Sequence, residues 1–159
     1  MAQGKYLETE IGRLYLAEED GCIVRISSGQ APVGDVLGDS PLLEQAITEV
    51  AEYLAGKRQE FSVPVKAKGT PFQEKVWAAL RQIPFGETRS YGEIAKEVGS
   101  PKGARAVGMA CNRNPVLLMI PCHRLVGSNG KLVGFACGLP MKEKLLSLEK
   151  AIESCDKNE

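Results

Sequence analysis

Three helix-start signals constrain the fold of this chain more than any other feature of its sequence. Ser40-Pro41 precedes an apolar helical face, and the segments Thr-Pro-Phe-Gln at 70–73 and Ser-Tyr-Gly-Glu at 90–93 are capping boxes. In a capping box, a hydroxyl side chain and a Gln or Glu three residues later bind backbone N–H groups that a helix leaves unpaired at its start. These signals therefore predict where three helices begin.

The first part of the chain predicts a small αβ domain over residues 1–62. Alternating runs at 12–17 and 22–27, separated by a Glu-Glu-Asp-Gly turn, predict a β-hairpin. The helix that opens at Ser40-Pro41 carries a regular apolar face and is expected to end at Gly56.

A second, mostly helical domain is predicted over residues 70–154, after a linker at 63–69 that contains Pro64 and several lysines. Trp77 continues the apolar face of the helix that begins at the first capping box, so we expect it in the core rather than as a base-stacking platform. The two parts together predict the α+β class.

Two short helices are predicted after the second capping box. The first would run over 91–98 and end at Gly99. Ser100 then offers a new N-cap and Pro101 suits a first helical position, so the second helix would begin there. It would carry three basic side chains outward: Lys102, Arg105 and Arg113. This spacing is typical of a helix-turn-helix, although two short helices joined by a Gly turn also occur as ordinary packing units.

The charge distribution is uneven within a neutral chain. The sequence has 20 basic and 20 acidic residues, yet no Asp or Glu lies between Glu97 and Glu143. The basic residues in that span are Lys102, Arg105, Arg113, Arg124, Lys131 and Lys142. Such a stretch favours a phosphate-rich partner confined to one face. Chance clustering on a solvated face is the alternative.

The segment Pro-Cys-His-Arg at 121–124 places a thiol beside the only histidine of the chain. A thiol attacks as its thiolate and has a pKa of about 8.5, so it needs a base or a positive field, which His123 and Arg124 could supply. Adjacent side chains diverge from the backbone, so we expect a water to relay the proton from Cys122. The alternative is an inert, buried Cys122 beside a surface His123.

These motifs resemble the O6-alkylguanine-DNA alkyltransferases, the methylated-DNA–protein-cysteine methyltransferases, over roughly residues 70–149. The resemblance rests on Ser90-Tyr91, Ala-Arg-Ala-Val-Gly at 104–108, Asn114-Pro115, Ile-Pro-Cys-His-Arg at 120–124, Gly134-Phe135 and Lys142-Glu143. It implies that Cys122 takes an alkyl group from the O6 atom of a guanine flipped out of double-stranded DNA. The thioether product resists hydrolysis, so each molecule would react once.

The resemblance also implies roles around the thiol. His123 resembles the base that draws the thiol proton through water, and Glu149 resembles the carboxylate that orients its imidazole. The sequence supports Glu149 separately, because it lies beside an apolar helical stripe that includes Leu145, where a carboxylate needs a partner. A solvent-facing Glu149 at the edge of the stripe is the alternative. Arg124 would be structural or set the local field.

For DNA contacts, the resemblance implies that Arg105 enters the duplex in place of the flipped nucleotide and that Tyr91 presses the target phosphate round. The candidate DNA-binding residues are Ser90, Tyr91, Lys102, Arg105 and Arg113, and the candidate pocket and hinge residues are Asn114, Leu125, Phe135 and Ala136. Without the resemblance, Arg105 reads as a phosphate contact, Tyr91 as a core residue and Asn114 as a turn residue.

One segment departs from the usual family pattern. Phe135 stands where the family commonly has a Tyr, so it keeps a stacking face and lacks a hydroxyl. Ala136 still offers its backbone N–H toward the guanine O6. Cys137 adds a second thiol near the pocket, which leaves open the range of alkyl groups that fit.

Composition narrows the compartment and the partners. Five scattered cysteines show neither a paired framework nor metal-ligand spacing, so we expect a reducing compartment and no metal or cofactor. The sequence has no apolar stretch of about 18 residues and no signal peptide, which predicts a cytoplasmic protein, or a nuclear one in a eukaryote, without a membrane partner. We expect a monomer.

Three functions remain open from the sequence. The first is a single-turnover DNA alkyltransferase, and the second is a helix-turn-helix module that binds DNA without chemistry, against which Cys122 argues. The third is a cysteine hydrolase or acyltransferase that uses Cys122 and His123. It lacks an evident oxyanion loop and leaves the basic stretch unexplained.

Overall fold

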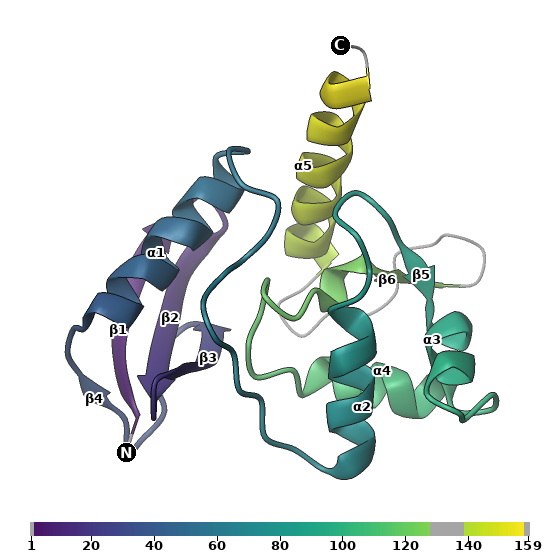
Figure 1. Ribbon diagram of the computed structural model, residues 1–159, viewed down its shortest axis with the longest axis horizontal. Helices are drawn as coiled ribbons and strands as arrows, with labels where there is room; N and C mark the ends of the chain where they lie inside the picture. Colours follow the sequence, from purple (N-terminus) through teal and green to yellow (C-terminus); the bar gives the residue numbers. More distant parts are fainter. Residues whose placement is uncertain (1, 128–138, 158–159) are drawn as a thin grey trace. The chain divides into compact units, whose positions relative to one another are not determined.

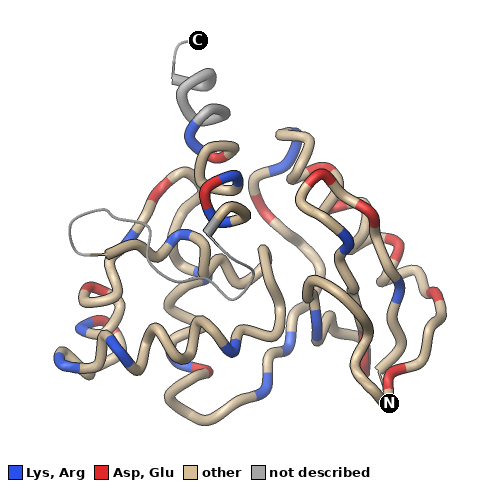
Figure 2. The backbone as a smooth tube through the Cα atoms, turned by 180° about the vertical axis from the view of Figure 1, so that it is seen from behind, with Lys and Arg blue, Asp and Glu red and all other residues tan. Residues whose placement is uncertain are grey.

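The computed structural model describes residues 2–127 and 139–157 and is drawn in Figures 1 and 2. Its contacts group residues 1–68 with 115–119 as a first unit, and residues 69–114 with 120–159 as a second unit. The first unit holds a sheet and one helix, and the second is mostly helical. This mixture confirms the predicted α+β class.

The sheet of the first unit has the order β3-β2-β1-β4. Its strands are β1 (Gln3–Thr9), β2 (Gly12–Glu19), β3 (Cys22–Ser28) and β4 (Val36–Leu37), with β4 parallel to β1 and the other pairs antiparallel. The predicted hairpin is β2–β3, turned by Asp20 and Gly21 at positive φ. Strand β1 was not predicted, because its buried position is Gly4, which lies against the ring of Tyr15 and leaves no alternating apolar pattern.

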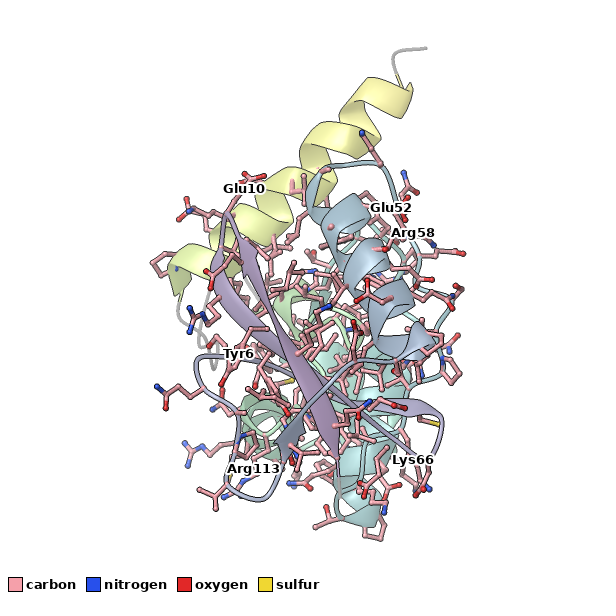
Figure 3. All side chains as sticks on the ribbon, turned by 90° about the vertical axis from the view of Figure 1, so that its left-hand side faces the viewer. Tyr6, Glu10, Glu52, Arg58, Lys66 and Arg113 are labelled. Carbon is pink, nitrogen blue, oxygen red and sulfur yellow. The ribbon has the colours of Figure 1, made fainter. Side chains whose placement is uncertain are left out.

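Helix α1 (Pro41–Leu54) packs against this sheet (Figure 1). It begins as predicted, since the Ser40 hydroxyl accepts the Leu43 N–H at 3.1 Å, and Gly56 follows its end at positive φ. The segment after α1 is tied back to it: Arg58 Nε donates to Glu52 Oε1 at 3.1 Å, at the place labelled in Figure 3.

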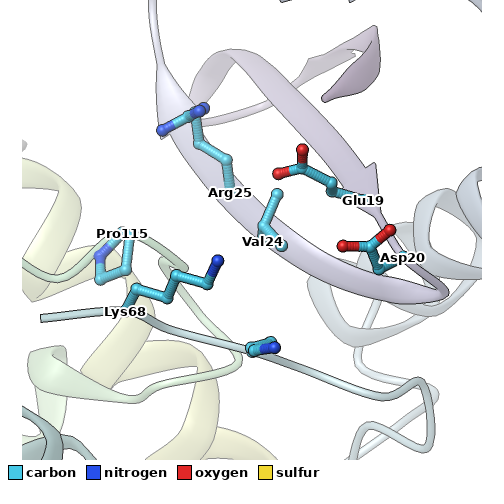
Figure 4. A pocket seen from close by; sticks show the side chains of 7 residues that line it. Glu19, Asp20, Val24, Arg25, Lys68 and Pro115 are labelled. Carbon is cyan, nitrogen blue, oxygen red and sulfur yellow. The ribbon is translucent and has the colours of Figure 1, made fainter. Parts of the chain in front are cut away.

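Residues 115–119 belong to the first unit because they pair with β3. The Ile26 N–H donates to the Pro115 carbonyl at 2.9 Å, and the Leu117 N–H donates to the Ile26 carbonyl at 3.0 Å. A hollow of about 180 Å³ lies beside this pairing (Figure 4). Its lining residues are Glu19, Asp20, Val24, Arg25, Lys66, Lys68 and Pro115. Nothing in the sequence indicated that the chain returns to the first sheet just before the candidate active site.

The second unit contains four helices and a small parallel sheet among its described residues. They are α2 (Pro71–Leu80), β5 (Arg89–Ser90), α3 (Tyr91–Glu97), α4 (Ala104–Asn112), the 3-10 turn η1 (Cys122–Arg124), β6 (Leu125–Val126) and α5 (Leu139–Lys157). Both predicted capping boxes are present, at Thr70 with Gln73 and at Ser90 with Glu93. None of the helices in this described part, nor in that of the first unit, has the length and apolarity to cross a membrane.

The prediction that the second helix of the pair begins at Ser100 and Pro101 was wrong. Helix α4 begins at Ala104, with Gly103 as an N-cap that makes no side-chain bond. The reason is a turn: the Gly103 N–H donates to the Ser100 carbonyl at 2.8 Å, so Pro101 and Lys102 form the turn rather than the first helical residues. Helices α3 and α4 are therefore joined by residues 98–103.

Trp77 lies in the core of the second unit, as predicted. Its side chain is buried, and its Nε1–H donates to the Ala110 carbonyl at 2.9 Å. Because Trp77 is on α2 and Ala110 is on α4, this bond fixes the two helices against each other.

We predict that Trp77→Phe lowers the free energy of unfolding, because it removes a buried hydrogen bond and part of a buried apolar side chain, at a cost of about 1–3 kcal/mol. Urea denaturation of wild type and variant measures the loss. Unchanged stability together with weakened DNA binding would contradict the core assignment and make Trp77 a stacking residue.

Candidate active site

Cys122 begins the 3-10 turn η1 and is only 2% exposed. Asn114 Nδ2 donates to the Ile120 carbonyl at 2.8 Å and to Cys122 Sγ at 3.2 Å. Asn114 follows the end of α4, so its amide links that helix to the turn that carries the thiol. A hinge role for Asn114 requires such a contact, and the role itself stays a prediction.

His123 and Glu149 meet within the second unit. His123 Nε2 lies 2.7 Å from Glu149 Oε2, and both side chains are buried. A neutral imidazole that donates its Nε2–H to this carboxylate keeps Nδ1 as its basic nitrogen. Glu149 comes from α5, so the C-terminal helix supplies the carboxylate to the residue beside the thiol.

Arg124 holds the same carboxylate from another side. Its Nε and Nη2 atoms donate to the two oxygens of Glu149 at 2.9 and 3.1 Å, and its Nη1 donates to the Ile83 carbonyl at 2.6 Å. The Gly86 N–H adds a bond to Glu149 Oε1 at 3.1 Å. Sequence reasoning had not named the partner of Arg124. The structure places its guanidinium in a two-oxygen clamp on Glu149.

The environment lowers the pKa values of both His123 and Glu149. Burial raises the pKa of Glu149, but the hydrogen bonds and charges of His123 and Arg124 outweigh it and hold that pKa at about 2. Burial lowers the pKa of His123, with Arg124 adding to this effect against the bond to Glu149. At neutral pH the site therefore contains an ionised carboxylate and an uncharged imidazole.

The small sheet brings Tyr91 toward the site. Strands β5 and β6 are parallel, and Ser90 pairs with Val126. Tyr91 follows β5 directly, while β6 follows η1, and Leu125 in β6 is fully buried. The hydroxyl of Ser90 accepts the Glu93 N–H at 3.0 Å, so this candidate DNA contact also caps α3.

Lys142 lies in the same buried region, a position that the sequence reasoning missed. It is 0% exposed, its Nζ is 3.5 Å from the Tyr91 hydroxyl, and it lies within electrostatic range of Cys111 and Cys122. Burial lowers the pKa of Lys142, and the two thiols oppose that effect. Spacing was the available signal, since Lys142 precedes Glu149 by two helical turns on one face of α5.

The phenol of Tyr91 is held in its protonated form. Burial, with a smaller electrostatic effect of Cys111 and Cys122, raises the pKa of Tyr91 to about 12. Tyr91 is therefore a hydrogen-bond donor across the neutral range.

The expectation that the whole basic stretch faces a phosphate-rich partner needs correction. Arg124 and Lys142 are buried, because one is bound by Glu149 and the other packs beside Tyr91. The exposed cations of the stretch are Lys102 in the α3–α4 connection, Arg105 in α4 and Arg113 at its end (charges in Figure 2). Lys131, Phe135, Ala136 and Cys137 lie outside the described residues.

Among the residues with described positions, no group of three or more His, Cys, Asp or Glu side chains could hold a metal ion. Cys22, Cys111 and Cys122 are present as thiols. The described site thus offers a thiol, an imidazole on the next residue that is bonded to a carboxylate, and a helix pair with exposed arginines. That combination defines a protein with a cysteine nucleophile and a surface suited to an anionic ligand.

Comparisons with known proteins assign the family. The family described as 6-O-methylguanine DNA methyltransferase, DNA binding domain, matches residues 71–151. The companion 6-O-methylguanine DNA methyltransferase, ribonuclease-like domain, matches residues 4–67. The chain belongs to the 6-O-methylguanine DNA methyltransferase family, which confirms the resemblance inferred from its motifs.

Relatives match nearly the full chain. A methylated-DNA–protein-cysteine methyltransferase of Methanosarcina acetivorans is 45% identical over 147 residues, covering 89% of this chain and 94% of the relative. The constitutive enzyme of that name from Bacillus subtilis is 44% identical over 90% of this chain and 92% of its own. The crystal structure of Mycobacterium tuberculosis OGT in complex with DNA superposes with a TM-score of 0.89 at 39% identity, over 94% of each chain.

We predict that Glu149 makes folding stability depend on acid pH. Its pKa is about 2 in the folded protein against an ordinary 4.5, so its stabilising effect is complete above pH 4.5 and is lost as pH falls toward 2. His123, whose folded pKa is also lowered, adds a loss of stability that begins below its ordinary 6.5. Glu149→Gln should lower stability at pH 7 by about 3–5 kcal/mol, because it leaves Arg124 buried without its counter-charge.

Urea denaturation of wild type and Glu149→Gln from pH 7 to pH 3 measures this effect, and the difference between them should shrink as the pH falls. Glu143→Gln is the matched control, since Glu143 is an exposed carboxylate on the same helix. A constant difference across the pH range would contradict a lowered pKa for Glu149.

Proposed function

We propose that this protein repairs DNA by direct reversal, transferring the alkyl group of O6-alkylguanine in double-stranded DNA irreversibly to Cys122. The observation that carries the proposal is the position of the Cys122 thiol, held by Asn114 and adjacent to the His123–Glu149 pair. Relatives that match nearly the full chain are named methylated-DNA–protein-cysteine methyltransferases, and a similar structure was solved with DNA.

In this proposal His123 and Glu149 take up the thiol proton. Nδ1 of neutral His123 accepts the proton of Cys122 through a water molecule, and the ionised Glu149 stabilises the imidazolium that forms. The thiolate attacks the saturated carbon on guanine O6, so a C–S bond forms and the C–O bond breaks. The departing guanine takes up one proton, which balances the proton lost by the thiol.

Arg124 acts as a positioning residue in this scheme. Its two bonds fix both oxygens of Glu149, which in turn fixes the ring of His123. No oxyanion forms in a displacement at saturated carbon, so the site needs no oxyanion hole. The product is a thioether, which water does not cleave, and each molecule therefore acts once.

Base flipping uses the exposed part of the helix pair. The target atom is inaccessible in stacked DNA, so the nucleotide has to leave the helix. Arg105 on the exposed face of α4 fills the vacated space, and Tyr91 guides the rotated nucleotide toward Cys122. Lys102 and Arg113 bind phosphates, with Ser90 at the start of α3. Asn114 and Leu125 shape the pocket together with Phe135 and Ala136.

The reaction has simple requirements, which we include in the proposal. A thiol displacement needs no metal or cofactor, and the protein acts as a monomer. Cys22, Cys111 and Cys122 as thiols suit the reducing cytoplasm. The chemistry belongs to the domain over residues 70–154, which follows the domain over 1–62 and the linker at 63–69.

The direct test is mass spectrometry after incubation with an O6-methylguanine duplex. Wild type should gain one methyl group on Cys122 and stop after one equivalent. Cys122→Ala should gain none yet bind DNA with nearly wild-type affinity, because the buried thiol supplies reactivity and little contact area. Cys22→Ala is the control and should react fully.

Three results would contradict the proposal. Unchanged wild-type mass with tight DNA binding would select the module without chemistry, and turnover of an ester would select the hydrolase. Methylated Cys122→Ala protein would move the nucleophile to another cysteine, with Cys137 the first to examine.

We predict that Arg105→Ala reduces repair of duplex DNA much more than reaction with free O6-benzylguanine, because only the duplex requires the extruded base to be replaced. Single-turnover rates on both substrates measure the ratio. Lys102→Ala is the comparison: it should weaken duplex binding and lower its salt slope by about one unit, as loss of one phosphate contact does. Equal losses on both substrates in Arg105→Ala would show that Arg105 supports the fold or the pocket.

A further inference from the structure

Helix α4 presents one exposed row whose centre is apolar. The exposed residues of the helix and its C-cap are Arg105, Ala106, Met109, Asn112 and Arg113, spaced as one helical face. Met109 is 58% exposed, and the other exposed large hydrophobic side chains in the described parts of the chain all belong to the first unit. Within the described second unit, Met109 is therefore the one large apolar side chain left strongly exposed.

The position of Met109 is fixed by the opposite face of the helix. Val107, Ala110 and Cys111 are buried, and the Ala110 carbonyl accepts the bond from Trp77. A rotation of α4 that would cover Met109 would expose these side chains and break that bond. The exposure of Met109 is thus a property of the packed fold.

The charges around Met109 select the class of partner. Arg105 and Arg113 lie four residues before and after it on the same row, and no acidic residue occurs from 98 to 142. A surface that alternates cation, apolar group and cation is complementary to a ligand with anionic groups on both sides of an apolar strip. A DNA groove has this pattern, with phosphates on its edges and deoxyribose and base edges between them.

We propose that Met109 is a DNA-contacting residue, whose thioether packs on deoxyribose and base edges between the phosphates that flank it. The proposal rests on the proposed function only for its ligand, a DNA duplex. Met suits the task, because its flexible side chain fits irregular apolar surfaces and Met is among the apolar wedges that DNA-bending proteins insert. The small, exposed neighbour Ala106 on the same row lets the helix backbone come close.

Salt separates this contact from the contacts of the arginines. A phosphate contact releases counterions, so its loss lowers the slope of affinity against salt. Burial of a thioether removes apolar surface from water and releases no counterion. Loss of Met109 should therefore weaken binding by the same factor at every salt concentration.

The test measures the dissociation constant of an undamaged duplex at several salt concentrations. Met109→Ala should bind about fivefold more weakly at each concentration, with an unchanged slope, as expected for partial burial of an apolar side chain. Arg113→Ala should show a slope lower by about one unit. Leu37→Ala, which removes an exposed hydrophobic side chain of the first unit, should bind as wild type. The melting temperature of Met109→Ala should equal that of wild type, since the side chain is exposed.

Three outcomes would overturn the inference. They are wild-type affinity in Met109→Ala, a slope change equal to that of Arg113→Ala, or sedimentation showing that Met109→Ala abolishes a wild-type dimer. The proposed function is judged separately by methyl transfer. A wild type that transfers methyl while Met109→Ala binds normally defeats only the inference. A wild type that binds DNA without transfer, and loses affinity in Met109→Ala, defeats only the proposed function.

Discussion

The buried carboxylate of Glu149 is the group on which the described site depends. An ionised carboxylate is costly to bury unless donors surround it. Here the donors come from separate segments: His123 and Arg124 in η1, and the Gly86 N–H in the loop after α2. The same contacts that make Glu149 tolerable in the core fix the imidazole of His123, the residue that follows the thiol in sequence. Folding of the second unit and assembly of its chemistry are therefore one event.

The helix pair α3–α4 and the turn that carries Cys122 are joined at two places. Asn114 ends the α4 segment and binds the Cys122 sulfur, while the β5–β6 pairing places the start of α3 beside the end of η1. Both links are direct contacts, one a side-chain hydrogen bond and the other a strand pairing, and they limit the freedom between the helix pair and the turn that carries Cys122. The position of a ligand held by α3 and α4 is consequently tied directly to the position of Cys122.

The sequence predicted the helix starts and the core position that depend on neighbouring residues. Both capping boxes, Ser40 and the core position of Trp77 follow from side chains within a few residues of each other. The failure at Ser100 shows the limit, since a turn and a helix start compete for the same residues and the turn won. The four-donor environment of Glu149 depends on segments far apart in sequence, which no local pattern records. The spacing of Lys142 before Glu149 indicated a shared face of α5, but not what buries it.

The return of residues 115–119 to the first sheet has a consequence for how such a chain can be divided. Asn114 and Ile120 group with the second unit, while the five residues between them complete the first. Val116 and Leu117 are buried by that pairing. A fragment cut at residue 69 would carry this apolar strand without its partner, next to the nucleophile. Exchange of halves between relatives at residue 69 must therefore preserve a strand-to-strand fit as well as a linker.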